Sequence, residues 1–141
     1  MDYIKAKEKA IKYIGISKKT SQEVSKKLKT LDVEEDIICR VIEYLEELGY
    51  IDDIDYAESY IRQNVKMLKY STYELKQKLL QKGIKASIIE STFEYGLPND
   101  YENQVANKLI SSKLKAYDDI KKKEYLYRRG FKLDNIEDIF E

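Results

Sequence analysis

A pattern of helix-ending residues that occurs three times constrains the fold of this chain most strongly. The segments 20–33, 71–84 and 118–131 each begin with a residue that caps helix N-termini, namely Thr20, Ser71 and Asp118. Twelve positions later, each segment has a residue that tolerates the left-handed conformation at a helix C-terminus: Asp32, Gly83 and Gly130. This spacing predicts one helix of about three turns in each segment.

Further residues in these segments support the same interpretation. Glu23 and Glu74 stand three residues after their N-caps, as a capping box requires. The residue after each helix stop is apolar, and a leucine precedes it by five positions, in the pairs Leu28–Val33, Leu79–Ile84 and Leu126–Phe131. This pairing is typical of the Schellman ending of a helix.

Helices are also expected before and after each segment. Apolar residues with i, i+4 spacing follow in the pairs Ile38–Ile42, Ile89–Phe93 and Ile136–Phe140, and similar groups precede the segments at 10–14, 57–61 and 106–110. We therefore predict an all-α protein of three tandem three-helix repeats that form an elongated, curved helical rod. The predicted repeats are residues 1–49, 50–97 and 98–141.

Two short linkers separate these repeats. In the first, GYIDD at 49–53, we expect Gly49 to end one helix and Asp52 or Asp53 to cap the next. The second, GLPND at 96–100, is expected to work in the same way, with Gly96 as the stop and Asp100 as the cap.

The composition excludes several classes of protein. Without histidine, the chain has no Ser-His-Asp or Cys-His nucleophile and no HExxH metal site. Its five glycines lie too far apart for a phosphate-binding glycine loop. The single Cys39, the absence of an apolar leader and the absence of a stretch of about 18 apolar residues predict a cytoplasmic protein without a membrane span. We expect no enzyme activity, cofactor or metal.

Charge alternates along the chain although the formal net charge is zero. Residues 1–31, 59–85 and 103–133 are rich in Lys and Arg, whereas 32–58, 86–102 and 134–141 are rich in Asp and Glu. Stacked repeats would align these blocks into basic and acidic stripes, which suit a partner that carries both signs, such as protein on nucleic acid. Ordinary solvated helix faces are the alternative explanation of the charges.

Several motifs resemble those of the RecX family, the small bacterial regulators of the RecA recombinase. They are the opening at Ser21–Leu28, with its Lys27, LGYIDDIDYAESYI at 48–61, KLLQKGI at 78–84 and RRGF at 128–131. The chain departs from the family pattern at Lys69 and Tyr70, where a glycine is common, and it uses lysine where arginine is frequent. The resemblance implies a monomeric, non-enzymatic modulator that binds in the groove of RecA filaments on single-stranded DNA and inhibits them.

The resemblance also suggests roles for individual residues. The framework residues would be Gly49, Asp52, Asp53, Ala57, Gly83, Gly130 and Phe131. The candidates for contact with DNA or RecA are the basic residues Lys26, Lys27, Arg62, Lys78, Lys82, Lys122, Arg128 and Arg129. Two other functions stay open from the sequence: a helix-turn-helix regulator that binds duplex DNA directly, and a helical-repeat scaffold for an unrelated protein.

Overall fold

The computed structural model describes residues 1–141 and contains nine α-helices and no strand. The helices are α1 (Tyr3–Ile16), α2 (Ser21–Thr30), α3 (Glu35–Glu47), α4 (Asp53–Met67), α5 (Thr72–Gln81), α6 (Ala86–Gly96), α7 (Tyr101–Ser111), α8 (Asp119–Arg128) and α9 (Leu133–Ile139). The all-α prediction is confirmed. None of the helices is both long and apolar enough to cross a membrane.

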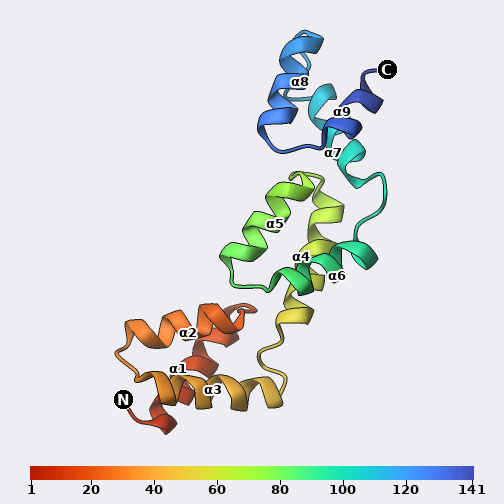
Figure 1. The fold of residues 1–141 in the computed structure, drawn as a ribbon. Coiled ribbons are helices and arrows are strands. Elements are labelled where there is room, and N and C mark those ends of the chain that lie inside the picture. The colour runs from red at the N-terminus through yellow and green to blue at the C-terminus, as the bar shows by residue number, and fades with distance from the viewer.

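The helices are arranged in three groups along an elongated molecule, with the termini at opposite ends (Figure 1). Packing is densest within α1–α3, within α4–α6 and within α7–α9. The second helices of the groups, α2, α5 and α8, follow one another along one side (Figure 1). The exact repeat boundaries at 49/50 and 97/98 stay a prediction.

The predicted caps form as the sequence indicated. The side chains of Thr20, Ser71 and Asp118 accept hydrogen bonds from the backbone N–H three residues later, and Glu23 and Glu74 complete capping boxes. At the other ends, Asp32, Gly83 and Gly130 have φ values of +59°, +86° and +85°. The Schellman bonds run from the N–H groups of Val33, Ile84 and Phe131 to the carbonyls of Leu28, Leu79 and Leu126, each at 3.1 Å.

The two linkers differ from each other, which corrects one expectation. Gly49 has a φ of +79°, and Asp52 caps α4 by accepting from the Asp55 N–H at 3.0 Å, as predicted. Gly96 ends α6 and Asp100 holds the N-cap position of α7, as predicted, but Gly96 does not adopt positive φ and the Asp100 side chain makes no cap bond. Pro98 explains the first difference, because a proline disfavours helical geometry at the residue before it, and Leu97 is extended.

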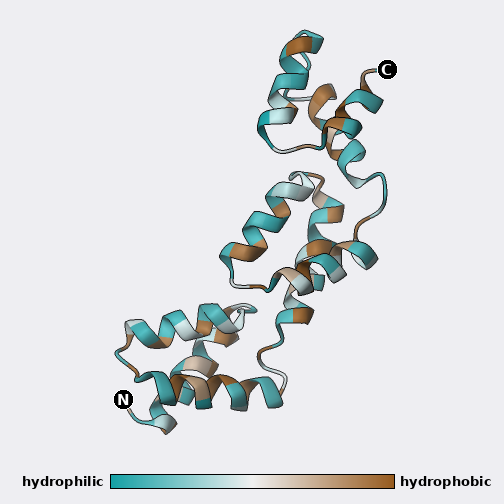
Figure 2. Ribbon diagram, viewed as in Figure 1, coloured by the Kyte–Doolittle hydropathy of each residue, from teal (hydrophilic) through white to brown (hydrophobic).

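The core consists of two hydrophobic clusters. One contains nine buried residues from α1–α3 and the following loop, up to Ile51. The other contains thirteen and extends without interruption from α4 to α9. Hydrophobic and hydrophilic positions alternate along the helices (Figure 2), as amphipathic helices around such cores require. The second and third groups therefore share one core, which the repeat pattern alone did not reveal.

Candidate partner-binding surface

Three of the predicted contact residues meet in one hollow, although they come from two helices. Lys26 of α2 and Lys78 of α5 line it together with Lys82, the residue that ends α5. The hollow has a volume of about 460 Å³, and its other lining residues are Glu23, Tyr60 and Gln81. We call it the α2–α5 hollow. It concentrates three cations where the first two helix groups meet.

Tyrosine rings and one carboxylate contact two of these lysines. The Lys78 ammonium lies 4.4 Å from the centre of the Tyr70 ring, and that of Lys82 lies 5.8 Å from the Tyr56 ring. Lys82 also faces Glu23 at 3.9 Å. Burial acts to lower the pKa of Lys82, but the hydrogen bond with Tyr56 and the charge of Glu23 outweigh it and raise the pKa. Lys82 therefore keeps its positive charge at neutral pH.

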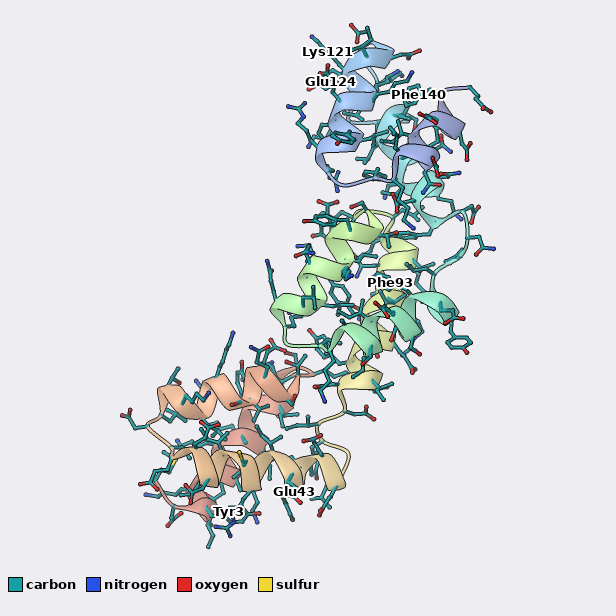
Figure 3. The ribbon with its side chains drawn as sticks, in the orientation of Figure 1. Tyr3, Glu43, Phe93, Lys121, Glu124 and Phe140 are labelled. Carbon is teal, nitrogen blue, oxygen red and sulfur yellow. The ribbon has the colours of Figure 1, made fainter.

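The other candidates lie elsewhere. Lys27 is exposed and lies 5.5 Å from the centre of the Tyr13 ring. Arg62 lines a separate hollow of about 660 Å³ between α4 and α6, where it pairs with Glu58 at 3.9 Å. Lys122 is half-buried and Arg128 exposed on α8, the helix whose Lys121 and Glu124 extend outward in Figure 3. The structure therefore gives no single surface for all eight basic candidates.

Arg129 makes contacts within the molecule. Its guanidinium donates to Glu74 at 2.8 Å and to the Lys69 carbonyl at 2.7 Å, and only 21% of its side chain is exposed. Burial acts to lower the pKa of Arg129, but bonding to Glu74 outweighs it and raises the pKa. Arg129 thus joins α8 to α5, and its contact with a partner stays a prediction.

One hydrogen-bonded link between consecutive helix groups, which we call a joint, occurs twice along the molecule. The Thr20 hydroxyl donates to the Lys82 carbonyl at 2.6 Å, and the Ser71 hydroxyl donates to the Arg129 carbonyl at 2.8 Å. Each hydroxyl also accepts the cap bond of its own helix, so it links the start of one second helix to the end of the next. Sequence reasoning missed these joints. The residue type at each N-cap could have indicated them. The hydroxyls of Thr20 and Ser71 can both donate and accept a hydrogen bond, whereas the carboxylate of Asp118 can only accept.

Five of the seven framework candidates lie at or near these joints or in a core, whereas Gly49 and Asp52 lie in the exposed linker before α4. Asp53 accepts from the Ser21 N–H at 2.8 Å and from the Ser21 hydroxyl at 2.6 Å, which ties α4 to α2. Ala57 and Phe131 are buried in the larger core. A Cβ at Gly83 would overlap Gln22, and one at Gly130 would lie 2.7 Å from Tyr73. The two glycines therefore permit both the left-handed turn and the close approach of the preceding group.

Two protein-family models match this chain, and together they cover most of the first two helix groups. Residues 6–45 match the family model described as RecX, first three-helix domain, and residues 52–92 match the model described as RecX, second three-helix domain. Together these ranges comprise more than half of the chain. They coincide with α1–α3 and α4–α6 to within a few residues.

Curated relatives carry the same family name. Regulatory protein RecX of Lacticaseibacillus paracasei is 41% identical over 78 residues, which are 55% of this chain and 32% of that protein. Its counterpart in Clostridium acetobutylicum is 37% identical over 83 residues, which are 59% of this chain and 38% of that protein. The chain thus matches between about a third and two fifths of the length of these two relatives.

Solved structures resemble the whole chain. The crystal structure of RecX from Lactobacillus salivarius is 29% identical, with a TM-score of 0.84 over 98% of this chain and 94% of that one. A crystal structure of a regulatory protein RecX is 26% identical, with a TM-score of 0.87 over 97% of this chain and 72% of that one. The family models, the relatives and the shared fold agree, and the chain therefore belongs to the RecX family of regulatory proteins.

Proposed function

We propose that this protein is a non-enzymatic regulator of the RecA recombinase. It acts in the cytoplasm as a monomer without a cofactor, and it binds in the groove of RecA filaments on single-stranded DNA. There it inhibits filament assembly, recombination and co-protease activity. Membership of the RecX family is the observation that carries this proposal.

The shape and the charges of the molecule support it. An elongated row of helix groups suits a groove that runs along a filament, since each group contacts a new part of the partner (Figure 1). The α2–α5 hollow presents lysines to DNA phosphates or acidic protein surface, while the acidic side chains of α3 suit basic surface of the filament. A partner that carries both signs fits this pattern better than bare DNA does.

Binding of the fluorescently labelled protein to four partners tests the proposal. The partners are RecA filaments preformed on single-stranded DNA, RecA alone, the single strand alone and duplex DNA, each at a low and a high salt concentration. We expect binding to the filament to be tightest and to weaken with salt, and filament growth to slow when the protein is added.

Two results would contradict the proposal. Equally tight binding to bare duplex DNA would favour a helix-turn-helix regulator instead. An absence of binding to any of the four partners would leave a scaffold for an unrelated protein.

A further inference from the structure

A second basic cleft lies between the end of α4, α7 and α8. It has a volume of about 740 Å³. No carboxylate lines it, and its charged or aromatic lining residues are Lys66, Lys69, Lys108, Lys113, Tyr125 and Arg129. We call it the α4–α8 cleft. Of these, only Arg129 was a predicted contact residue, because the segments that carry the others meet only in the folded chain.

Some of these cations are anchored by the protein itself. Lys108 donates to the Met67 carbonyl at the end of α4 at 2.8 Å, and Arg129 donates to the Lys69 carbonyl at 2.7 Å. The turn between Met67 and Lys69 is fixed by Leu68, which adopts the left-handed conformation with a φ of +52°. The cleft thus has defined walls that do not depend on a ligand.

The remaining charges lack acidic partners. Among the ion pairs of the structure, none includes Lys66, Lys69, Lys108 or Lys113, and Arg129 alone is paired, with Glu74. Hydrogen bonding from Lys113 lowers the pKa of the Tyr125 phenol, burial opposes this change, and Arg129 adds to the lowering. Cations that line one cleft without acidic partners repel one another, and a bound anion relieves the repulsion.

The cleft and the α2–α5 hollow share one equivalent residue, the one that ends the second helix of its group. Lys82 ends α5, contributes the carbonyl of the first joint and lines the hollow. Arg129 follows α8 in the same way, contributes the carbonyl of the second joint and lines the cleft. Basic sites therefore occur at both successive joints, which suits a ligand whose negative charges repeat along its length.

We propose that the α4–α8 cleft binds phosphate groups of a nucleic-acid strand, with Lys66, Lys69 and Lys113 as the ligand-facing cations. A single strand carries one phosphate charge on every nucleotide. Free oligophosphate offers the same chemical groups and is the alternative ligand. Binding at this site does not require RecA, so its test is independent of the proposed regulation of filaments.

The test compares two variants that lose the same charge. Lys66→Gln/Lys113→Gln removes two exposed cations from the cleft, and Lys9→Gln/Lys12→Gln removes two exposed cations from α1, outside it. Binding of a fluorescein-labelled oligothymidylate is measured by anisotropy at several salt concentrations, without RecA. We expect weaker binding by the cleft variant, with a log–log salt slope smaller by about 1.4, because a single strand releases about 0.7 counterion per neutralised phosphate. The α1 variant should bind as the unchanged protein does.

A competition experiment separates the two sources of phosphate. We expect the oligothymidylate to shift the amide NMR signals of residues 66–69 and 108–113, and inorganic tripolyphosphate at equal phosphate concentration to displace it only weakly. Complete displacement by tripolyphosphate would overturn the assignment to a strand. Unchanged amide signals with both ligands, or equal losses in the two lysine variants, would overturn the site itself.

Discussion

Gly83 has a φ of +86°, and the Gln22 side chain occupies the space that a Cβ there would need. Gly130, with a φ of +85°, lies against Tyr73 in the same way. Gly49 has a φ of +79°, but no neighbouring atom lies within 4 Å of the position that a Cβ would take. A side chain would therefore strain the backbone at all three positions, but it would overlap a neighbouring side chain only at Gly83 and Gly130.

Alanine substitutions measure these costs. Gly49→Ala should lower the free energy of unfolding by about 1 kcal/mol, the strain of a left-handed alanine. Gly83→Ala and Gly130→Ala should each lower it by about 1–3 kcal/mol more, since the neighbouring group has to move. Urea unfolding of the three variants checks this order. Equal losses at all three positions would show that the close contacts carry no energy.

Tyr101 makes stability depend on pH. Its hydroxyl donates to the Tyr70 carbonyl at 2.6 Å, and burial, aided by Glu102 and Glu74, raises the pKa of Tyr101 to about 12. The phenol of an unfolded chain titrates near pH 10. Because the folded-state pKa is the higher one, this contribution to stability is complete below about pH 10 and is lost as the pH rises towards about 12.

The variant Tyr101→Phe tests that contribution. Its free energy of unfolding should fall less than that of the unchanged protein between about pH 9 and about pH 11. Tyr95→Phe is the control, because 86% of Tyr95 is exposed, and it should follow the unchanged protein. A Tyr101→Phe curve parallel to that of the unchanged protein would contradict the assignment.

Among the helices, the two joints differ in strength. Glu74 closes the capping box of α5 and also binds Arg129 at 2.8 Å, whereas Glu23 closes that of α2 and faces Lys82 at 3.9 Å. A bidentate guanidinium holds a carboxylate better than an ammonium at the longer distance does. The ion pair at the α5–α8 joint is therefore the stronger of the two.

Double-mutant cycles with glutamine quantify the two pairs. We expect a coupling free energy of about 1–3 kcal/mol for Glu74–Arg129, and below about 1 kcal/mol for Glu23–Lys82. Thermal and urea unfolding of the single and double variants supply the values. A coupling for Glu23–Lys82 as large as that for Glu74–Arg129 would show that distance does not set the strength of the joint.

Local signals explain why the helices were predictable and the joints were not. The caps at Thr20, Ser71 and Asp118 and the stops at Gly83 and Gly130 act on residues a few positions away, so the sequence shows them directly. The joint bonds connect residues about sixty positions apart, and their geometry depends on how whole groups stack. Leu68 gave no signal either, because leucine rarely adopts a left-handed backbone.

Across the whole molecule, the arrangement of the cores sets the cooperative units. Residues from α4 to α9 share one cluster, whereas α1–α3 have their own. Leu126→Ala should therefore destabilise by about 2–5 kcal/mol and increase hydrogen exchange in α4–α6 as well as in α7–α9. Protection in α1–α3 should change less. Faster exchange confined to α7–α9 would contradict the shared core.

The candidate site shows the same limit of sequence reasoning at a larger scale. Charge blocks identified basic helices, but only the fold brings Lys26 next to Lys78 and leaves Arg62 in a different hollow.

The shared core also matters for any test of binding. Removing α7–α9 would take away part of the core that α4–α6 share with them, so point variants on the intact chain are the sounder comparison.

The most direct test of the central claim compares two double variants in binding to RecA filaments on single-stranded DNA. Lys26→Glu/Lys78→Glu reverses two charges in the α2–α5 hollow, and Lys9→Glu/Lys12→Glu reverses two on α1. If the hollow contacts the filament, the first variant should bind at least about tenfold more weakly, or about 1.4 kcal/mol, while the second binds nearly as the unchanged protein does. Equal affinity of both variants and the unchanged protein would contradict the claim.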